Sequence, residues 1–103
     1  MARDTQVLKV LRNMARTPSK EWWYAPDFQR PNMPSDLYVG YEATARISDV
    51  IREYPSLLDV KRDGRFRYVK LRPTAEFSDS VPSEIVSMIK RERREGQYDG
   101  RNY

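Results

Sequence analysis

The fold is decided by residues 41–72, which read YEATARISDVIREYPSLLDVKRDGRFRYVKLR. In the first half of this stretch, apolar residues recur at steps of three and four, at Ala43, Ile47, Val50, Ile51 and Tyr54. That spacing places one apolar stripe along a helix, so residues 41–54 predict a helix of about four turns. Gly40 and Pro55 mark the two ends of this helix.

The second half of the stretch, residues 57–71, predicts two strands joined by a tight turn. Asp63 and Gly64 lie between the strands, and this pair favours a two-residue hairpin because both residues tolerate positive φ. The register expected from this turn pairs Arg62 with Arg65, Val60 with Arg67, and Leu58 with Val69. One face of the hairpin would then be apolar at its base and basic toward its tip.

A helix followed directly by a basic two-stranded ribbon resembles the recognition helix and wing of the winged helix-turn-helix superfamily. Residues 42–50, EATARISDV, are similar to the recognition-helix segment of its small phage, viral and archaeal members, through Glu42, Ala43, Arg46, Ile47, Ser48, Asp49 and Val50. The resemblance implies an α+β fold of order α-β-α-α-β-β-α. It would contain a three-helix core, a wing of two or three strands, and a C-terminal helix.

The resemblance further implies that the protein binds double-stranded DNA as a small transcriptional regulator. The helix would enter the major groove, and the hairpin would lie on the backbone or in the minor groove. In the helix, Arg46 and Arg52 are the side chains able to reach guanine O6 and N7. Thr44 and Ser48 suit phosphates or thymine methyl groups. In the hairpin, the contacts would come from Lys61, Arg62, Arg65 and Arg67.

The residues leave alternatives open. In one alternative, Arg46 and Arg52 only form ion pairs on the helix surface, with Glu42, Asp49 or Glu53. In a second alternative, the basic residues of the hairpin serve only to prevent aggregation through the edge of the sheet. A function of another class is also open, because winged helices also dock proteins. In that case the surface would be an aromatic patch made of Trp22, Trp23, Tyr38 and Phe66.

The positive charge of the chain is concentrated in the hairpin. The whole sequence carries a net charge of +4, with 19 basic and 15 acidic residues. Residues 61–72 contain six basic residues and one acidic residue, so this segment carries +5 and the remaining 91 residues sum to −1. A local positive ribbon is what contact with phosphates requires.

Composition predicts one small domain and argues against an enzyme. The chain has 103 residues, 39% hydrophobic, with neither cysteine nor histidine. The usual zinc ligands, thiol chemistry and the usual general base are therefore missing, and we expect no enzyme, no metal site and no cofactor. No apolar run is long enough for a membrane span or a secretory signal. We expect a cytoplasmic protein, associated with the nucleoid or, if viral, lying in the host cytoplasm.

The rest of the winged-helix domain, expected over residues 1–72, precedes the deciding stretch. A first helix is predicted from Asp4 or Thr5 to about Arg16, with an inward stripe made of Val7, Leu11 and Met14. Residues 19–25 predict a short strand that leaves one tryptophan partly exposed. Pro26 opens a short second helix with Phe28 pointing inward. Residues 30–39 then replace the three- or four-residue turn usual in a helix-turn-helix.

Beyond the hairpin, we expect a connector over residues 73–81, a last helix over residues 82–96, and a frayed tail over residues 97–103. The apolar stripe of the last helix either completes the core or pairs two copies of the chain. We favour a homodimer formed through Ile85, Met88 and Ile89. Phe66 and Tyr68, on the other face of the hairpin, are expected to pack beneath this helix rather than remain exposed.

Overall fold

The computed structural model describes residues 2–30, 33–34, 37–39 and 42–100. These residues form three α-helices, two short 3₁₀ helices and a two-stranded antiparallel sheet, so the fold is α+β. The elements in chain order are α1 (Ala2–Arg16), η1 (Ala25–Phe28), α2 (Ala43–Glu53), β1 (Leu58–Asp63), β2 (Phe66–Leu71), η2 (Thr74–Glu76) and α3 (Ser83–Gly100). Within the described ranges, no helix has the length and apolar character needed to cross a membrane.

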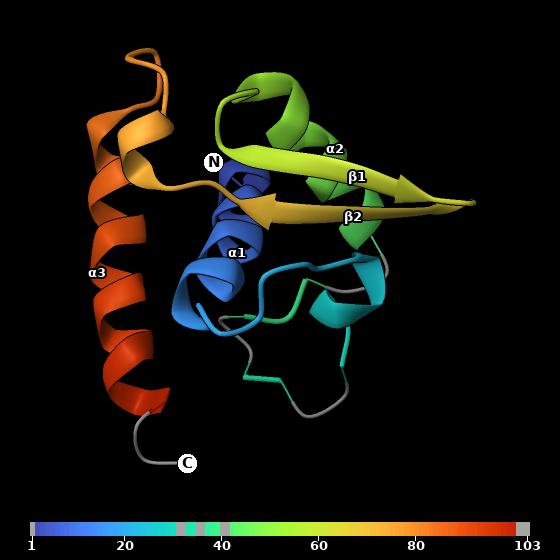
Figure 1. The fold of residues 1–103 in the computed structure, drawn as a ribbon, viewed down its shortest axis with the longest axis horizontal. Coiled ribbons are helices and arrows are strands. Elements are labelled where there is room, and N and C mark those ends of the chain that lie inside the picture. The colour runs from blue at the N-terminus through green and yellow to red at the C-terminus, as the bar shows by residue number, and fades with distance from the viewer. Residues whose placement is uncertain (1, 31–32, 35–36, 40–41, 101–103) are drawn as a thin grey trace.

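The tip of the hairpin and α3 lie at opposite ends of the molecule (Figure 1). α3 stands beside α1 at one end, and the β1–β2 hairpin runs past α2 and projects from the other. One hydrophobic core joins these elements, with fully buried side chains from α1, α2, β2 and α3 that include Val10, Val50, Val69 and Ile89. The projecting tip of the hairpin is therefore the part of the fold farthest from α3.

The first helix is confirmed, and Val7, Leu11 and Met14 are buried as predicted. Asn13 on the same helix is buried as well, although it is polar. Its side-chain amide donates to the carbonyl of Lys9 at 2.8 Å and to that of Leu37 at 2.7 Å. The second bond ties the segment before α2 to α1 and compensates for the burial of the amide.

The strand predicted over residues 19–25 is reduced to one isolated bridge, between Trp23 and Val69. The amide of each residue donates to the carbonyl of the other, at 2.8 Å in both directions. The pairing is short because η1 begins two residues later at Ala25. Trp23 is 1% exposed and stacks on Phe28 with ring centroids 5.0 Å apart, whereas Trp22 is only partly buried. The prediction that one tryptophan stays partly exposed is confirmed.

The predicted second helix is a single 3₁₀ turn, η1. Asp27 caps it, since its carboxylate accepts the amide of Tyr24 at 2.9 Å. Phe28 is fully buried, as predicted. The turn ends with Gln29, whose amide donates to the carbonyl of Pro26, and the Phe28 carbonyl accepts the amide of Val39. Part of the 30–39 segment (residues 31–32 and 35–36) lies outside the described residues.

The helix predicted over residues 41–54 is confirmed as α2, two residues shorter at its start and one at its end. Ala43, Ile47 and Val50 are buried, and Ile51 and Tyr54 are packed against the core, so the apolar stripe lies where the spacing placed it. Tyr54 closes the helix by donating its amide to the carbonyl of Val50. Positions 40 and 41, at the predicted start, lie outside the described residues.

The hairpin is confirmed, but its predicted register is wrong by two residues. Asp63 pairs with Phe66, and the pairs that follow are Arg62 with Arg67, Val60 with Val69, and Leu58 with Leu71. The turn therefore consists of Gly64 and Arg65. Of these, only Gly64 has positive φ, at +63°, which fits a turn with glycine at its first central position. Because the shift is even, each side chain still lies on its predicted face.

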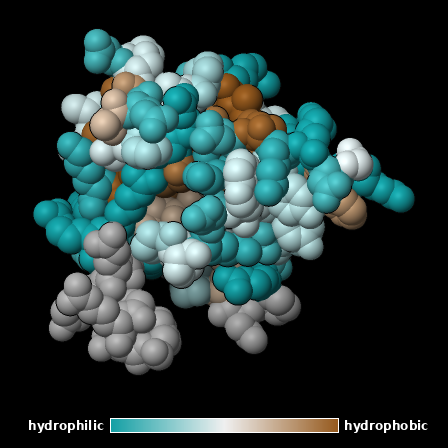
Figure 2. All heavy atoms as spheres, in the orientation of Figure 1, coloured by the Kyte–Doolittle hydropathy of each residue, from teal (hydrophilic) through white to brown (hydrophobic). Residues whose placement is uncertain are grey.

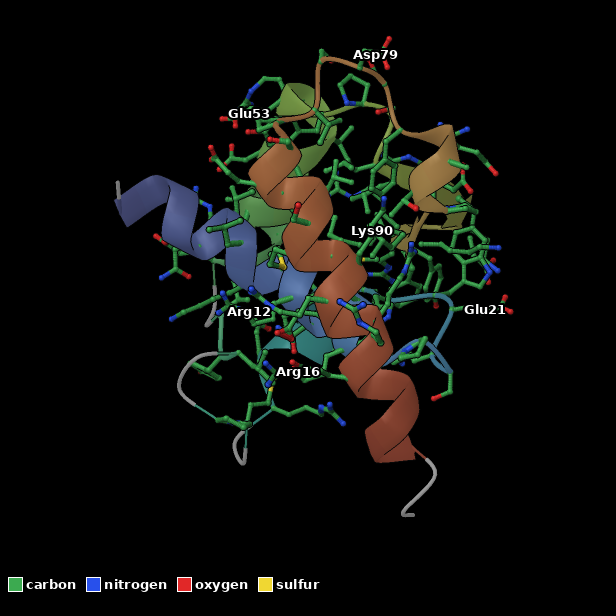
Figure 3. All side chains as sticks on the ribbon, turned by 90° about the vertical axis from the view of Figure 1, so that its left-hand side faces the viewer. Arg12, Arg16, Glu21, Glu53, Asp79 and Lys90 are labelled. Carbon is green, nitrogen blue, oxygen red and sulfur yellow. The ribbon has the colours of Figure 1, made fainter. Side chains whose placement is uncertain are left out.

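The predicted last helix is confirmed as α3, which begins one residue later than expected and continues to Gly100. It crosses α1 and covers it, as the view from its side shows (Figure 3). Ile85, Met88 and Ile89 are buried in the same core as α1. A homodimer formed through these three residues would therefore require α3 to separate from α1.

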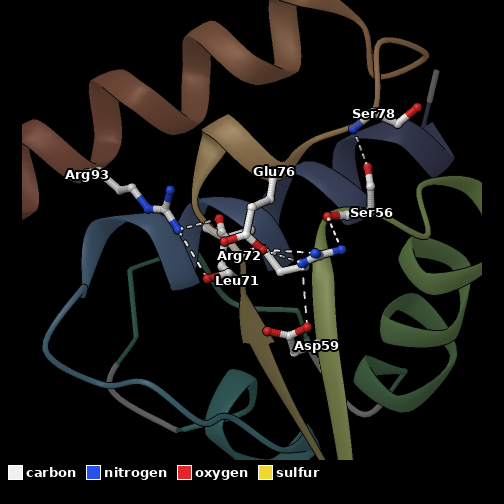
Figure 4. A network of polar contacts seen from close by, with 7 residues as sticks. All are labelled: Ser56, Asp59, Leu71, Arg72, Glu76, Ser78 and Arg93. Atoms are coloured by element: carbon white, nitrogen blue, oxygen red, sulfur yellow. Dashed lines mark hydrogen bonds and ion pairs between the residues drawn. The ribbon is translucent and has the colours of Figure 1, made fainter.

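The connector between the hairpin and α3 is held by arginines (Figure 4). Arg72 donates to Glu76 at 2.9 Å and lies 3.5 Å from a carboxylate oxygen of Asp59. Arg93 of α3 donates to the carbonyls of Leu71 at 3.2 Å and of Arg72 at 2.9 Å, and burial lowers the pKa of its guanidinium. These contacts fix the base of the hairpin and leave its tip to project.

Candidate nucleic-acid interface

Three arginines lie toward the tip of the hairpin: Arg62 and Arg65 are exposed, and Arg67 is partly buried. The fourth cation, Lys61, is exposed on the opposite face of β1 from Arg62. Hydrophilic side chains dominate this projecting tip in Figure 2. In the described part of the chain, none of the four has a carboxylate within ion-pair distance. The positive charge predicted for the hairpin is therefore available to an external anion.

Some cations elsewhere in the fold have acidic partners, whereas Lys90, Arg91 and Arg94 of α3 have none among the described residues. Carboxylates lie within 4.0 Å of Arg16, Lys20, Arg46, Arg52, Lys70 and Arg72. Ion pairing differs between the two ends of β2. Lys70 at the base of the hairpin lies 4.0 Å from Glu21, whereas Arg67 nearer the tip has no carboxylate partner among the described residues. Charge is thus balanced at the base of the hairpin and unbalanced at its tip.

Arg67 connects the hairpin to α2. Its Nη2 donates to the main-chain carbonyl of Thr44, in the first turn of α2, at 3.2 Å. Partial burial, and then the positive charge of Arg62, lower the pKa of the Arg67 guanidinium. The two arginines are neighbours because they form a directly opposed pair in the sheet. An anion bound here would offset this repulsion.

The two arginines expected to read bases are both bound to Asp49. Arg52 donates from Nη2 to Asp49 Oδ1, and the Nε of Arg46 lies 3.1 Å from Oδ2 of the same carboxylate. The Arg52 side chain is still 71% exposed, whereas that of Arg46 is only 23% exposed. The ion-pair alternative left open by the sequence is therefore present for both residues. Arg46 is the less accessible of the two to DNA.

The other two candidate residues of α2, Thr44 and Ser48, lie on its polar face. Thr44 is exposed, and Ser48, one turn further along α2, is partly exposed. Because the Thr44 carbonyl also accepts the bond from Arg67, the start of the polar face of α2 adjoins the basic end of the hairpin. The structure thus brings Arg67 to Thr44, leaves Ser48 and Arg52 further along α2, and turns Arg46 partly inward.

The outer face of the hairpin carries a second cluster, which the sequence did not predict as a unit. Lys61 lies 4.4 Å from the ring centre of Trp22, and Lys70 lies 5.5 Å from the same ring. The ring of Tyr24 meets those of Phe66 and Tyr68 at 6.3 and 5.6 Å. These contacts arise because the Trp23–Val69 bridge directs Trp22 and Tyr24 to the face opposite Trp23.

This cluster corrects two expectations. Phe66 and Tyr68 do not pack beneath the last helix; they lie against Tyr24, and Phe66 remains 49% exposed. The predicted aromatic docking patch also loses a member, because Trp23 is buried in the core. Alternation along residues 22–24 was the signal that could have assigned Trp22 and Tyr24 to the outer face together.

Comparisons with protein-family models, with curated proteins and with solved structures found no match. The chemistry of the surface therefore has to be read from its own side chains. Guanidinium groups bind phosphate oxygens through paired, charge-assisted hydrogen bonds, and hydroxyl groups add neutral ones. A basic ribbon beside a polar helix face has the donors that a polyanion requires.

Proposed function

We propose that this protein binds double-stranded DNA through a winged-helix arrangement in which the hairpin is the main contact. In this arrangement η1 takes the place of the second helix, and the Trp23–Val69 bridge takes the place of the third wing strand. The observation that carries the proposal is the group of hairpin cations without carboxylate partners among the described residues, of which Arg62, Arg65 and Arg67 lie toward the tip that projects away from α3.

The position of the tip relative to α2 supports this assignment. In winged-helix binding, a helix and a ribbon touch neighbouring parts of one duplex, so they have to be fixed relative to each other. The bond from Arg67 to Thr44 provides such a connection at 3.2 Å. The helix would present its face with Thr44, Ser48 and Arg52 to the major groove, while the hairpin follows the backbone or the minor groove.

The charge distribution supports a larger contribution to the affinity from the hairpin than from α2. α2 contains Arg46 and Arg52, but Asp49 neutralises part of their charge. Contacts with phosphates supply most of the affinity of general DNA binding, and contacts with bases supply sequence preference. We therefore expect a protein with strong general affinity for duplexes and a modest sequence preference, as befits a small regulator or an architectural protein.

The test is binding of a fluorescently labelled random-sequence duplex, followed by anisotropy at low salt. Wild type is compared with the triple variant Arg62→Ala/Arg65→Ala/Arg67→Ala, and circular dichroism verifies that both are folded. We expect wild type to bind and the variant to lose at least about tenfold in affinity, because three phosphate contacts are removed. A folded wild type that does not bind at low salt refutes the proposal.

A further inference from the structure

A groove of about 230 Å³ lies between the hairpin tip, the start of η1 and the first turns of α2. Tyr24 and Phe66 form an aromatic side of it, and Pro26 and Ile47 are apolar neighbours. Arg65 and Arg67 complete the lining on the hairpin. The groove exists because the chain turns away from β2 at η1, just beyond the Trp23–Val69 bridge, and leaves this end of the strand uncovered.

The aromatic side of the groove offers a surface for stacking. Phe66 is 49% exposed, an unusual amount for a phenyl ring in a small domain. It is held from one side by Tyr24, whose ring meets it edge-on with an angle of 82° between the planes. A flat aromatic ligand would cover the remaining apolar surface of Phe66 without displacing Tyr24.

The cationic side of the groove favours an anion. Arg65 and Arg67 line it, and no carboxylate does. Arg67 already has Arg62 opposite it in the sheet, and its pKa is lowered by burial and by that neighbour. The main-chain amide and carbonyl of Arg67 point to this edge, since those of Val69, two residues further along, point to Trp23. They are available to hydrogen-bond the edge of a ligand ring.

A ligand that matches this groove has an aromatic ring, an anionic group beside the ring, and hydrogen-bonding groups on the ring edge. A nucleotide has all three. We propose that this groove holds one unpaired nucleotide, with its base stacked on Phe66 and its phosphate bound by Arg65 and Arg67. Proteins that bind single-stranded nucleic acids stack unpaired bases on aromatic side chains in this way. The inference rests on the proposed function where the nucleotide belongs to bound DNA, and extends it to DNA with an unpaired base.

A base inside an intact duplex is already stacked on both sides and has to be extruded at a cost, which is lowest for an unpaired base. The protein should therefore prefer a duplex that contains one unpaired adenine over the same duplex fully paired. One stacked base corresponds to about tenfold in affinity. A free mononucleotide has the same base and phosphate without the duplex. Its binding therefore reports on the groove alone and not on the rest of the interface.

The experiment measures the affinity of the full chain for three probes. These are a fully paired duplex, the same duplex with one unpaired adenine, and deoxyadenosine 5′-monophosphate, the last followed by saturation-transfer NMR. The variant Phe66→Leu removes the ring of the groove, and Phe66→Tyr restores a ring. Tyr68→Leu is the matched control, because Tyr68 lies on the same face of β2 and contacts Tyr24 but does not line the groove.

We expect wild type, Phe66→Tyr and Tyr68→Leu to favour the unpaired adenine about tenfold, and Phe66→Leu to lose this preference while it still binds the paired duplex. Equal affinity of wild type for both duplexes, or a preference that persists in Phe66→Leu, overturns the inference and leaves the proposed function intact. Binding of the mononucleotide, lost in Phe66→Leu, without any binding of DNA, refutes the proposed function and supports the groove. If the protein binds none of the three probes, both the proposed function and the inference about the groove are overturned.

Discussion

Arg67 in β2 donates a hydrogen bond from Nη2 to the main-chain carbonyl of Thr44 in α2, 3.2 Å away and 23 positions earlier in the chain. The carbonyl belongs to the first turn of α2, and the donor belongs to the basic end of the hairpin. This contact joins the start of α2 to the basic end of the hairpin.

Asp49→Asn should raise the affinity for duplex DNA about fivefold, because it releases Arg52 from its ion pair and removes one negative charge beside the interface. Glu84→Gln makes the same change in net charge at an exposed position of α3 and should have little effect. Anisotropy titrations of both variants provide the measurement. An equal gain in both would mean that only net charge matters, and that α2 does not approach DNA.

Trp23→Ala should lower the free energy of unfolding by about 3–5 kcal/mol, since it removes a fully buried ring that stacks on Phe28. Trp22→Ala should cost about 1 kcal/mol, the order expected for loss of its cation–π contacts with Lys61 and Lys70. Urea denaturation of the two variants separates these effects. Equal losses would contradict the assignment of the two rings to opposite faces.

Gly64→Ala should destabilise the hairpin by about 1 kcal/mol, because position 64 has a φ of +63° that alanine adopts only with strain. Nothing lies within 4 Å of the place that the added methyl group would occupy, so the cost comes from the backbone alone. Gly64→Asn is the control, since asparagine tolerates this region better. Thermal unfolding should rank the variants as glycine, asparagine and alanine, and any other order would argue against this turn.

Glu92→Ala should lower the free energy of unfolding by about 2 kcal/mol, because it leaves the guanidinium of Arg16 without its two carboxylate bonds, at 2.9 and 3.2 Å. The Glu92 side chain is only 6% exposed, where α3 crosses α1, and Figure 3 shows Arg16 at that crossing. Glu95→Ala, at an exposed position of α3, should cost little. Similar losses in both would indicate that α3 is not fixed on α1 in solution.

Periodicity in the sequence predicted the helices and strands but not how they pair and pack with one another. The apolar stripes located α1, α2 and α3, and the Asp63-Gly64 pair located the hairpin. The register was off by two because a type I′ turn would need positive φ at both central residues, whereas only Gly64 has it. The predicted second helix is only one 3₁₀ turn and the predicted third strand only one bridge, because η1 begins two residues after the Trp23–Val69 bridge.

The candidate site was predictable in charge and less so in geometry. Counting charges identified the hairpin cations, and the ion pairs of Asp49 were foreseen as an alternative because Arg46 and Arg52 are three positions away from it. No local pattern indicates that Arg67 reaches Thr44, since this depends on how the hairpin folds over α2. The same holds for the groove beside Phe66, which three separate segments form.

The central claim, that the hairpin tip holds DNA phosphates, is tested most directly by the slope of log K against log salt concentration. The triple hairpin variant Arg62→Ala/Arg65→Ala/Arg67→Ala is compared with Lys90→Ala/Arg91→Ala/Arg94→Ala, which removes the same charge from exposed positions of α3 at the opposite end of the molecule. We predict that the hairpin variant loses about 0.9 of slope per phosphate contact, between 2 and 3 in all, while the α3 variant keeps the wild-type slope. Equal losses of slope in the two variants would contradict the claim.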